Sequence, residues 1–276
     1  MALTNFIPQL WSGALLAHLD KAHVVANLVN RNYEGEIRQY GDTVKISQIG
    51  DITVSDYTEN TDINDPQELS VTQKVLTIDK QKYFNFQIDD VDAAQGRTSL
   101  MDAAMQRAAY ALADETEKII LTAMDTDAAT KIVPAATLDA TNVYKELVNV
   151  KVAMDKKNVS TTGRWLIVSP DTHALLLQDN RFVGTGGSMA ESTVQNGFVG
   201  RVLGFDVYLS NNISTLTNGN AAIAGVNMAC TFAEQIVETE AYRMEKRFAD
   251  AVKGLNIFGV KVIYPDCLVC LKKTNP

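Results

Sequence analysis

The stretch YFNFQIDDVDAAQGR, residues 83–97, joins a strand-like pattern to a cluster of acids. Aromatic and apolar residues alternate with polar ones up to Ile88, which is typical of a half-buried strand. Three aspartates follow within four positions: Asp89, Asp90 and Asp92. Carboxylates this close together either bind a metal ion or begin a helix, where acids oppose the positive end of the helix dipole. The choice separates an enzyme from a structural protein.

A helix start accounts for the aspartates without further partners. Gly96 suits the residue after a short helix, and Ser99 with Asp102 has the spacing of a capping box for a second helix. About 25 residues, reaching Met124, would give a helix of ~37 Å. Its expected apolar face consists of Met101, Ala104, Met105, Ala108, Leu112 and Ile119.

A metal site would need further acids or histidines that converge from elsewhere, and the sequence shows no such partners. An Asp-based metal-dependent hydrolase that uses Asp89, Asp90 and Asp92 stays as the alternative from the enzyme class.

The residues before this stretch, 42–88, predict a long two-stranded hairpin with a loose tip. Its strand-like segments are DTVKIS, DITVSDY, ELSVTQKVLTID and KYFNFQID, and the turn formers of TENTDINDPQ lie between them. In the third segment, Thr72, Lys74, Leu76 and Ile78 share one side, and Val71, Val75 and Thr77 share the other. An isolated hairpin is marginally stable in water, so we expect this one to lean on another surface.

The charge of this hairpin has one sign. No basic residue lies between Lys45 and Lys74, whereas six acids do: Asp51, Asp56, Glu59, Asp62, Asp65 and Glu68. Such a run is either a solvated loop or a negative arm that docks on a basic surface of another subunit.

Residues 8–30 have the spacing of an amphipathic helix that precedes every domain-like segment. Pro8 suits its first turn, and the helix needs a surface to lie on, its own or a neighbour's. The residues that recur every three or four positions are Trp11, Leu15, His18, Ala22, Val25 and Val29.

The second half of the chain alternates between helix and strand patterns. Residues 139–157 predict a helix, 165–169 a short buried strand, and 204–210 another strand. Ser169 is placed to cap the helix that follows it, with Pro170 in the first turn. Residues 221–237 are apolar and fit either state. The final 20 residues of pattern, 254–273, predict two strands that join near Pro265 and Asp266.

The composition describes a globular protein rather than one that coats nucleic acid. Apolar residues make up 46% and charged residues 21%, the net charge is −8 and the pI is about 5.0. Phosphate binding needs clustered Lys and Arg. The chain begins without a secretory signal pattern, and its longest apolar run, 221–233, is shorter than the ~20 residues of a membrane span. A reducing cytoplasm is therefore expected.

Other candidate chemistry is weak. The GTGGS loop, residues 184–188, lacks the Lys-Ser/Thr of a phosphate-binding loop. Cys267 and Cys270 would point to opposite faces of a strand. No nucleophile motif accompanies the histidines His18, His23 and His173. We predict no catalytic residue, no metal and no cofactor.

Five segments, in order along the chain, resemble the major capsid (coat) proteins of tailed bacteriophages. They are NRNYEGEIRQYGDTVKI (30–46), YFNFQIDDVDAAQ (83–95), KKNVSTTGRWLIVSPDTHALLLQDNRF (156–182), GFVGRVLGFDVYLSNNI (197–213) and AYRMEKRFADAVKGLNIFGVKVIYP (241–265). None is specific by itself, but five in the right order are, and they run across nearly the whole chain.

The resemblance implies an α+β fold, the one shared by tailed-phage and herpesvirus capsids. Its expected parts are an N-terminal arm (1–40), an extended loop made by the long β-hairpin (41–88), the spine helix and peripheral domain (89–130), an axial α/β domain (131–237) and the return strands of the peripheral domain (238–276).

The function implied is that of a major capsid protein, which is structural and not enzymatic. It would assemble with copies of itself, as hexamers and pentamers, into an icosahedral head shell around double-stranded DNA. Assembly would take place in the host cytoplasm, without a membrane and without sequence-specific DNA binding. Because the chain begins directly with the arm, we expect a separate scaffolding protein, and also a portal. An encapsulin-like nanocompartment shares the fold and stays as a second alternative.

The resemblance also favours the acidic hairpin as a contact between subunits. The basic residues Arg97, Arg107 and Arg164 are further possible partners for its acids. The residues expected at intersubunit contacts are Asp56, Glu59, Asp62, Asp65 and Glu68 on the hairpin, Arg243, Lys246 and Arg247 as the basic cluster, and Trp11 and Leu15 on the leading helix.

Overall fold

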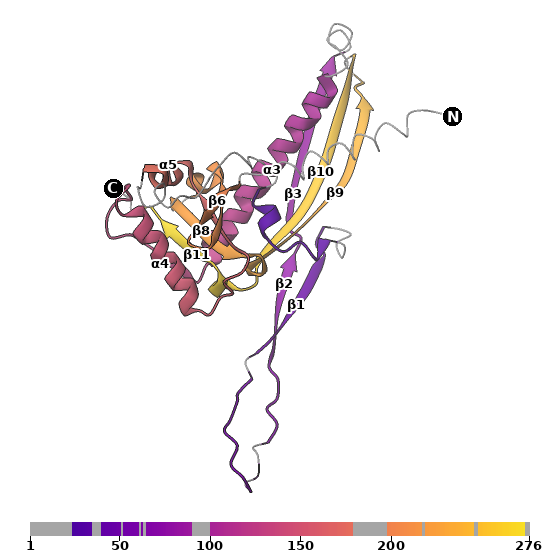
Figure 1. Cartoon of the computed structure of the whole chain (residues 1–276). Helices are drawn as coiled ribbons and strands as arrows, with labels where there is room; N and C mark the ends of the chain where they lie inside the picture. The colour runs from indigo at the N-terminus through magenta and orange to yellow at the C-terminus, as the bar shows by residue number, and fades with distance from the viewer. Residues whose placement is uncertain are drawn as a thin grey trace.

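The molecule has a body of two sheets and their helices, from which a hairpin projects away (Figure 1). The computed structural model describes residues 24–34, 40–50, 52–60, 62, 65–89, 100–178, 198–216, 219–245 and 248–273. Within these residues, no helix is both long and apolar enough to cross a membrane. Asp90, Asp92 and the GTGGS loop lie outside the described residues.

A six-stranded mixed sheet forms the largest core. Its order is β4 (Thr130–Ile132), β11 (Val269–Lys272), β8 (Asn220–Val226), β5 (Arg164–Val168), β7 (Phe205–Leu209) and β6 (Phe198–Val202). Every residue of β5 and β8 is buried, as expected of central strands covered on both faces. The 3-10 helix η4 (Asn211–Thr215) follows β7. The strands predicted at 165–169 and 204–210 are confirmed.

Two helices belong to this core, α4 (Val143–Lys156) and α5 (Pro170–Gln178). The predicted helical stripe of α4 is confirmed, since Val143, Leu147, Val150 and Met154 are its buried residues. The predicted cap of α5 is confirmed as well, because the Thr172 amide donates to Ser169 Oγ at 3.2 Å.

A three-stranded antiparallel sheet runs alongside the long helix α3 (Leu100–Asp127). Its order is β3 (Lys80–Asp89), β10 (Ala249–Val262) and β9 (Cys230–Arg243). The predicted long helix is confirmed, and its 28 residues span about 42 Å.

The buried face of α3 is rotated slightly from the predicted one. Met105 and Leu112 are buried as expected, but Ala109 and Ala113 are buried more deeply than Ala108. These side chains pack with Val252 of β10, and Phe84 and Phe86 of β3 lie against the same cluster.

The predicted hairpin is present but shorter than expected. Strands β1 (Thr43–Ile49) and β2 (Val71–Thr77) pair antiparallel, with Thr43 opposite Thr77. The DITVSDY segment, expected as strand, carries no strand over residues 52–57. The KYFNFQID segment is a strand, but β3 pairs with β10 and not with the hairpin. Phe84 and Phe86 are partly buried against the cluster that α3 forms with Val252 of β10, which explains the choice of partner.

The amino-terminal helix prediction is wrong where the structure tests it. Residues 8–23 lie outside the described residues, and residues 24–30 contain only the 3-10 turn η2 (Ala26–Leu28). Asn30 then forms a parallel bridge with Thr231 of β9, so the backbone there is extended. Val25, Ala26 and Val29 are buried in the main core, which gives the same apolar pattern a different conformation.

The ambiguous segment 221–237 is strand on both sides of the 3-10 turn η5 (Asn227–Ala229). The last two predicted strands are β10 and β11, joined by η6 (Pro265–Cys267) at the predicted place. Cys267 lies on this turn and not on a strand, which corrects the expected geometry of the cysteine pair.

Candidate assembly interface

The base of the hairpin packs on the molecule's own body. The predicted facing of β2 is confirmed, because Leu76 and Ile78 are buried whereas Val75 and Thr77 are exposed. With Val44 and Ile46 of β1, these two side chains form an apolar cluster against the body residues Ala233, Ile257 and Ile263.

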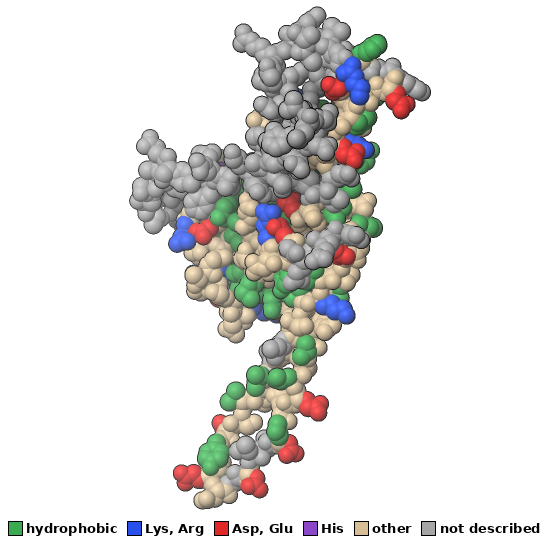
Figure 2. Space-filling model, turned by 90° about the vertical axis from the view of Figure 1, so that its right-hand side faces the viewer, with side chains coloured by type: hydrophobic (Ala, Val, Ile, Leu, Met, Phe, Trp, Pro, Cys, Tyr) green, Lys and Arg blue, Asp and Glu red, His purple; other side chains and the backbone are tan. Residues whose placement is uncertain are grey.

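The tip of the hairpin, residues 52–70, has no such support, and all its described residues are exposed. Several of these are large apolar residues: Val54 is 92% exposed, Tyr57 72%, Ile52 67% and Leu69 56%. Figure 2 shows apolar and acidic side chains together on the projecting end of the molecule. Exposed apolar residues gathered on one element mark a surface that binds a partner.

Sequence reasoning identified the acids of this tip and missed its apolar residues. Ile52, Val54 and Tyr57 belong to the DITVSDY segment, for which the sequence predicts a strand. Alternation along DITVSDY was the available signal, and it indicates an extended segment without telling which molecule covers it.

The predicted acids Asp56, Glu59, Asp62, Asp65 and Glu68 are all exposed on this tip. The sequence offers them no nearby basic partner, because no Lys or Arg lies between Lys45 and Lys74. The tip therefore presents mixed apolar and negative character.

Of the predicted basic cluster, the structure describes Arg243, at the end of β9. Its side chain is half exposed, and Nη1 lies 3.1 Å from Asp250 Oδ1. The end of β9 and the hairpin tip lie at opposite ends of the molecule (Figure 1). The structure thus does not bring them together within one chain. Lys246, Arg247, Arg97, Trp11 and Leu15 lie outside the described residues.

The other two candidate cations differ in availability. Arg164 is 3% exposed, and it donates to Asp155 Oδ1 at 2.6 Å and to the Val159 carbonyl at 2.6 Å. It holds the turn between α4 and β5 and cannot meet a neighbour. Arg107 is exposed on α3, beside Gln106 and Tyr110.

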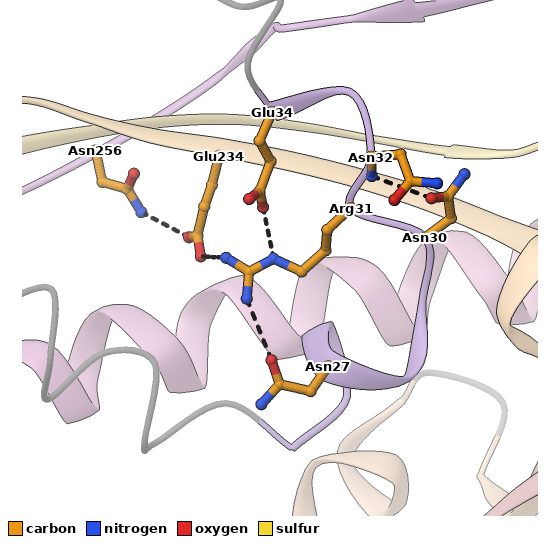
Figure 3. A network of polar contacts seen from close by, with 7 residues as sticks. All are labelled: Asn27, Asn30, Arg31, Asn32, Glu34, Glu234 and Asn256. Atoms are coloured by element: carbon orange, nitrogen blue, oxygen red, sulfur yellow. Dashed lines mark hydrogen bonds and ion pairs between the residues drawn. The ribbon is translucent and has the colours of Figure 1, made fainter.

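Residues 24–34, which we call the root of the expected amino-terminal arm, are tied to the body by a polar network (Figure 3). Arg31 donates to Glu34 at 2.6 Å, to Asn27 at 3.2 Å and to Glu234 of β9 at 3.2 Å. Asn256 of β10 also donates to Glu234, at 3.5 Å. A single guanidinium thus joins the arm to the three-stranded sheet.

Two further contacts hold the same root. The buried Glu117 of α3 accepts hydrogen bonds from the backbone amides of Val24 and Val25, the latter at 2.8 Å. Asn30 exchanges backbone hydrogen bonds with the strand β9, through Cys230 and Phe232, both at 3.0 Å. The described root, residues 24–34, is therefore fixed on α3 and β9.

The described residues offer little to a reaction. Among them, no three His, Cys, Asp or Glu side chains gather as a metal site would require. Burial raises the pKa of Cys230 and of Cys270 to about 12, so both stay protonated thiols at neutral pH. His173 lies in the first turn of α5, and burial lowers its pKa.

Comparison with known proteins places this architecture. The family model described as phage capsid protein matches residues 73–271. A structure from Mycobacterium phage Che8 is 28% identical, with a TM-score of 0.74 and 92% of each chain covered. The capsid structure of the cyanophage P-SCSP1u is 17% identical, with a TM-score of 0.70, covering 94% of this chain and 88% of that one.

A third structure, the asymmetric unit of the bacteriophage PhiM1 mature capsid, is 17% identical with a TM-score of 0.65, covering 85% of this chain and 82% of that one. No curated protein sequence matches the chain.

The family match runs from β2 to β11 and includes α3, α4, α5 and both larger sheets. The expected α+β capsid fold is confirmed. The family is structural, which decides against the hydrolase alternative, and it is a phage family, which decides against the cellular nanocompartment. The chain belongs to the phage capsid protein family, whose members form the head shell of the virion.

Proposed function

We propose that the tip of the hairpin is the segment by which each capsid subunit binds a neighbouring copy. One observation carries this proposal. The base of the hairpin is buried in its own body, whereas residues 52–70 project with exposed apolar side chains and charge of one sign. A segment built this way is completed by another molecule.

The proposed counterpart is the basic cluster of Arg243, Lys246 and Arg247, with Arg107 as a further cation. Because Arg243 and the tip lie at opposite ends of one molecule, a contact between them joins different copies. Opposite charges steer such an encounter, and the apolar residues Val54 and Tyr57 supply buried area once contact is made.

The same division of labour extends to the rest of the chain. In this proposal residues 1–40 form the arm, 41–88 the extended loop, 89–130 with 238–276 the peripheral domain, and 131–237 the axial domain. The arm carries Trp11 and Leu15 to a neighbouring subunit. The described root supports this role, because residues 24–34, which follow Trp11 and Leu15 in the sequence, are fixed to the body.

Repeated contacts make the shell stable. A specific protein interface buries ~1,600 Å², and a subunit in a hexamer or pentamer of an icosahedral shell takes part in several such contacts. Engagement of several neighbours at once turns modest contacts into strong association.

A separate scaffolding protein and a portal complete the proposed assembly, and the shell encloses double-stranded DNA. The net charge of −8 supports a wall that holds DNA loosely, because tight binding requires clustered cations that release counterions from phosphates.

The test reverses two charges at the tip, as Asp56→Lys with Glu59→Lys. We expect the midpoint of thermal unfolding of this variant to equal that of the native subunit. We also expect it to form few closed shells, counted by electron microscopy. The matched control, Asp127→Lys with Asp266→Lys, makes the same change in net charge on exposed acids of the body, and it should assemble. Normal shells from the tip variant would remove the proposal.

A further inference from the structure

A hairpin that binds a neighbour must leave its own body at a defined angle, and contacts at the base of the hairpin fix that angle. The hairpin meets the body along one face only, through the cluster of Val44, Ile46, Leu76 and Ile78. On β2 the burial stops at Leu76, and the residues from Val71 to Gln73 are exposed. The last contact therefore decides the direction of the free part.

That last contact is polar and is shared by both strands. Lys74 Nζ of β2 donates to the carbonyl oxygen of Ile263 at 2.5 Å. Gln48 Nε2 of β1 donates to the same oxygen at 3.2 Å. One acceptor on the body thus holds the hairpin from both of its strands, which opposes both bending and twisting.

The acceptor itself is held firmly. The amides of Ile263 and Tyr264 both donate to the carbonyl of Ala229, at 2.9 and 3.1 Å. Ile263 is 3% exposed. The peptide that receives Lys74 and Gln48 is therefore oriented by the body before the hairpin binds it.

A glycine sets the distance between hairpin and body. A Cβ atom at Gly259 of β10 would lie 2.4 Å from the carbonyl oxygen of Thr77 and 2.9 Å from Ile78 Cδ1. Real Cβ atoms do not approach backbone oxygen so closely. Any side chain at this position would push the end of β2 away from β10.

A second lysine provides the contrast. Lys45 on β1 and Lys74 on β2 flank the acidic tip in the sequence, and both belong to the paired part of the hairpin. Lys45 is exposed, whereas Lys74 is partly buried and bonded to the body. Lys45 is paired with Val75, the neighbour of Lys74 on β2. Because neighbouring residues of a strand point to opposite faces, Lys45 and Lys74 lie on opposite faces of the hairpin.

We propose that Lys74 and Gln48 on the Ile263 carbonyl, with Gly259 beneath Thr77, are positioning residues that set the angle of the docking arm and thereby the curvature of the shell. This inference rests on the proposed function of the tip. It goes beyond it, because the role assigned to these residues is to direct the hairpin and not to bind the neighbour.

The experiment compares Lys74→Met with Gln48→Leu, which removes both donors and keeps apolar stems, against Lys45→Met as the matched control. Particles of each full-length variant are imaged by cryo-electron microscopy, and their diameters and the angle between β1–β2 and β10 are measured. We expect open sheets, tubes or shells of several diameters in the double variant, and native shells in the control. When Lys74→Arg replaces Lys74→Met in the double variant, a donor is restored at this position, and most particles should return to the native diameter.

Shells of native diameter from the double variant would overturn the inference, even where the tip variant with Asp56→Lys and Glu59→Lys fails to assemble. In that case the docking function would stand and the angle-setting role would fall. Normal shells from both variants would remove both. If the double variant loses its cooperative thermal transition, Gly259→Ala tests the same angle from the side of the body, with the same expected and contrary outcomes.

Discussion

Ser169 caps α5, because its Oγ accepts a hydrogen bond from the Thr172 amide at 3.2 Å. Its role as the cap of α5 follows from its neighbours in the sequence, and the hydrogen bond from Thr172 confirms it. Lys74 is the opposite case, since its acceptor at Ile263 lies 189 positions away. No local pattern tells which lysine beside an acidic stretch faces the body. The close approach of Gly259 to the end of β2 cannot be predicted from the sequence either, because the two are far apart along the chain.

Substitution of Ser169 tests the local rule. Ser169→Ala should lower the free energy of unfolding by about 1 kcal/mol, because an amide in the first turn of α5 loses its acceptor. Thermal or denaturant unfolding of the subunit measures the change, and Thr161→Ala, at an exposed loop position, serves as the control. Equal stability of both variants would show that the cap contributes nothing.

At the scale of elements, periodicity predicted which segments are helices and strands better than it predicted their partners. The stripe of α4 and the strands β5, β7, β10 and β11 were foreseen, because burial on one or both faces leaves a mark in the sequence. The pairing of β3 with β10 was not, since alternation is the same whichever strand lies alongside. The helix predicted over residues 24–30 is wrong for a related reason. Val25 and Val29 are spaced as on a helix, but they are buried without forming one.

The contact between α3 and the arm root is testable at this scale. Glu117→Leu removes the acceptor of the Val24 and Val25 amides. A buried amide left without a partner costs about 1–3 kcal/mol. We expect roughly tenfold faster hydrogen exchange at Val25, measured in the intact protein, whereas Glu115→Leu, on the exposed side of α3, should leave that amide unchanged. Unchanged exchange in the Glu117 variant would mean that other contacts alone hold the root.

At the scale of the whole molecule, the sequence carried the charge of the hairpin but not its direction. Six acids without a cation are visible in the text of the chain. The placement of the five described acids at the far end from the end of β9 depends on packing between β2 and β10, which the composition does not reveal. The exposed apolar residues of the tip were missed for the same reason, because exposure is a property of the fold.

Salt provides a test at this scale. If the acidic tip meets cations of a neighbour, assembly should require more protein as ionic strength rises, because the screening length falls from about 10 Å at 0.1 M to about 3 Å at 1 M. Light scattering gives the concentration at half-maximal assembly. The neutral variant Asp56→Asn with Glu59→Gln should respond less to salt than the native chain. An identical salt response of the two proteins would argue that these acids lie outside the contact.

The fixed arm root has a mechanical consequence. A pull on the chain ahead of Val24 meets Glu117 on α3 first, and then the Arg31 network and the parallel bridge of Asn30 on β9. Load from a neighbouring subunit would thus enter α3 and β9 through a root that is itself buried in the body. Because Val25, Ala26 and Val29 pack in the main apolar core, freeing the root would break apolar contacts as well as hydrogen bonds, so a tethered subunit could bear force before the root comes loose.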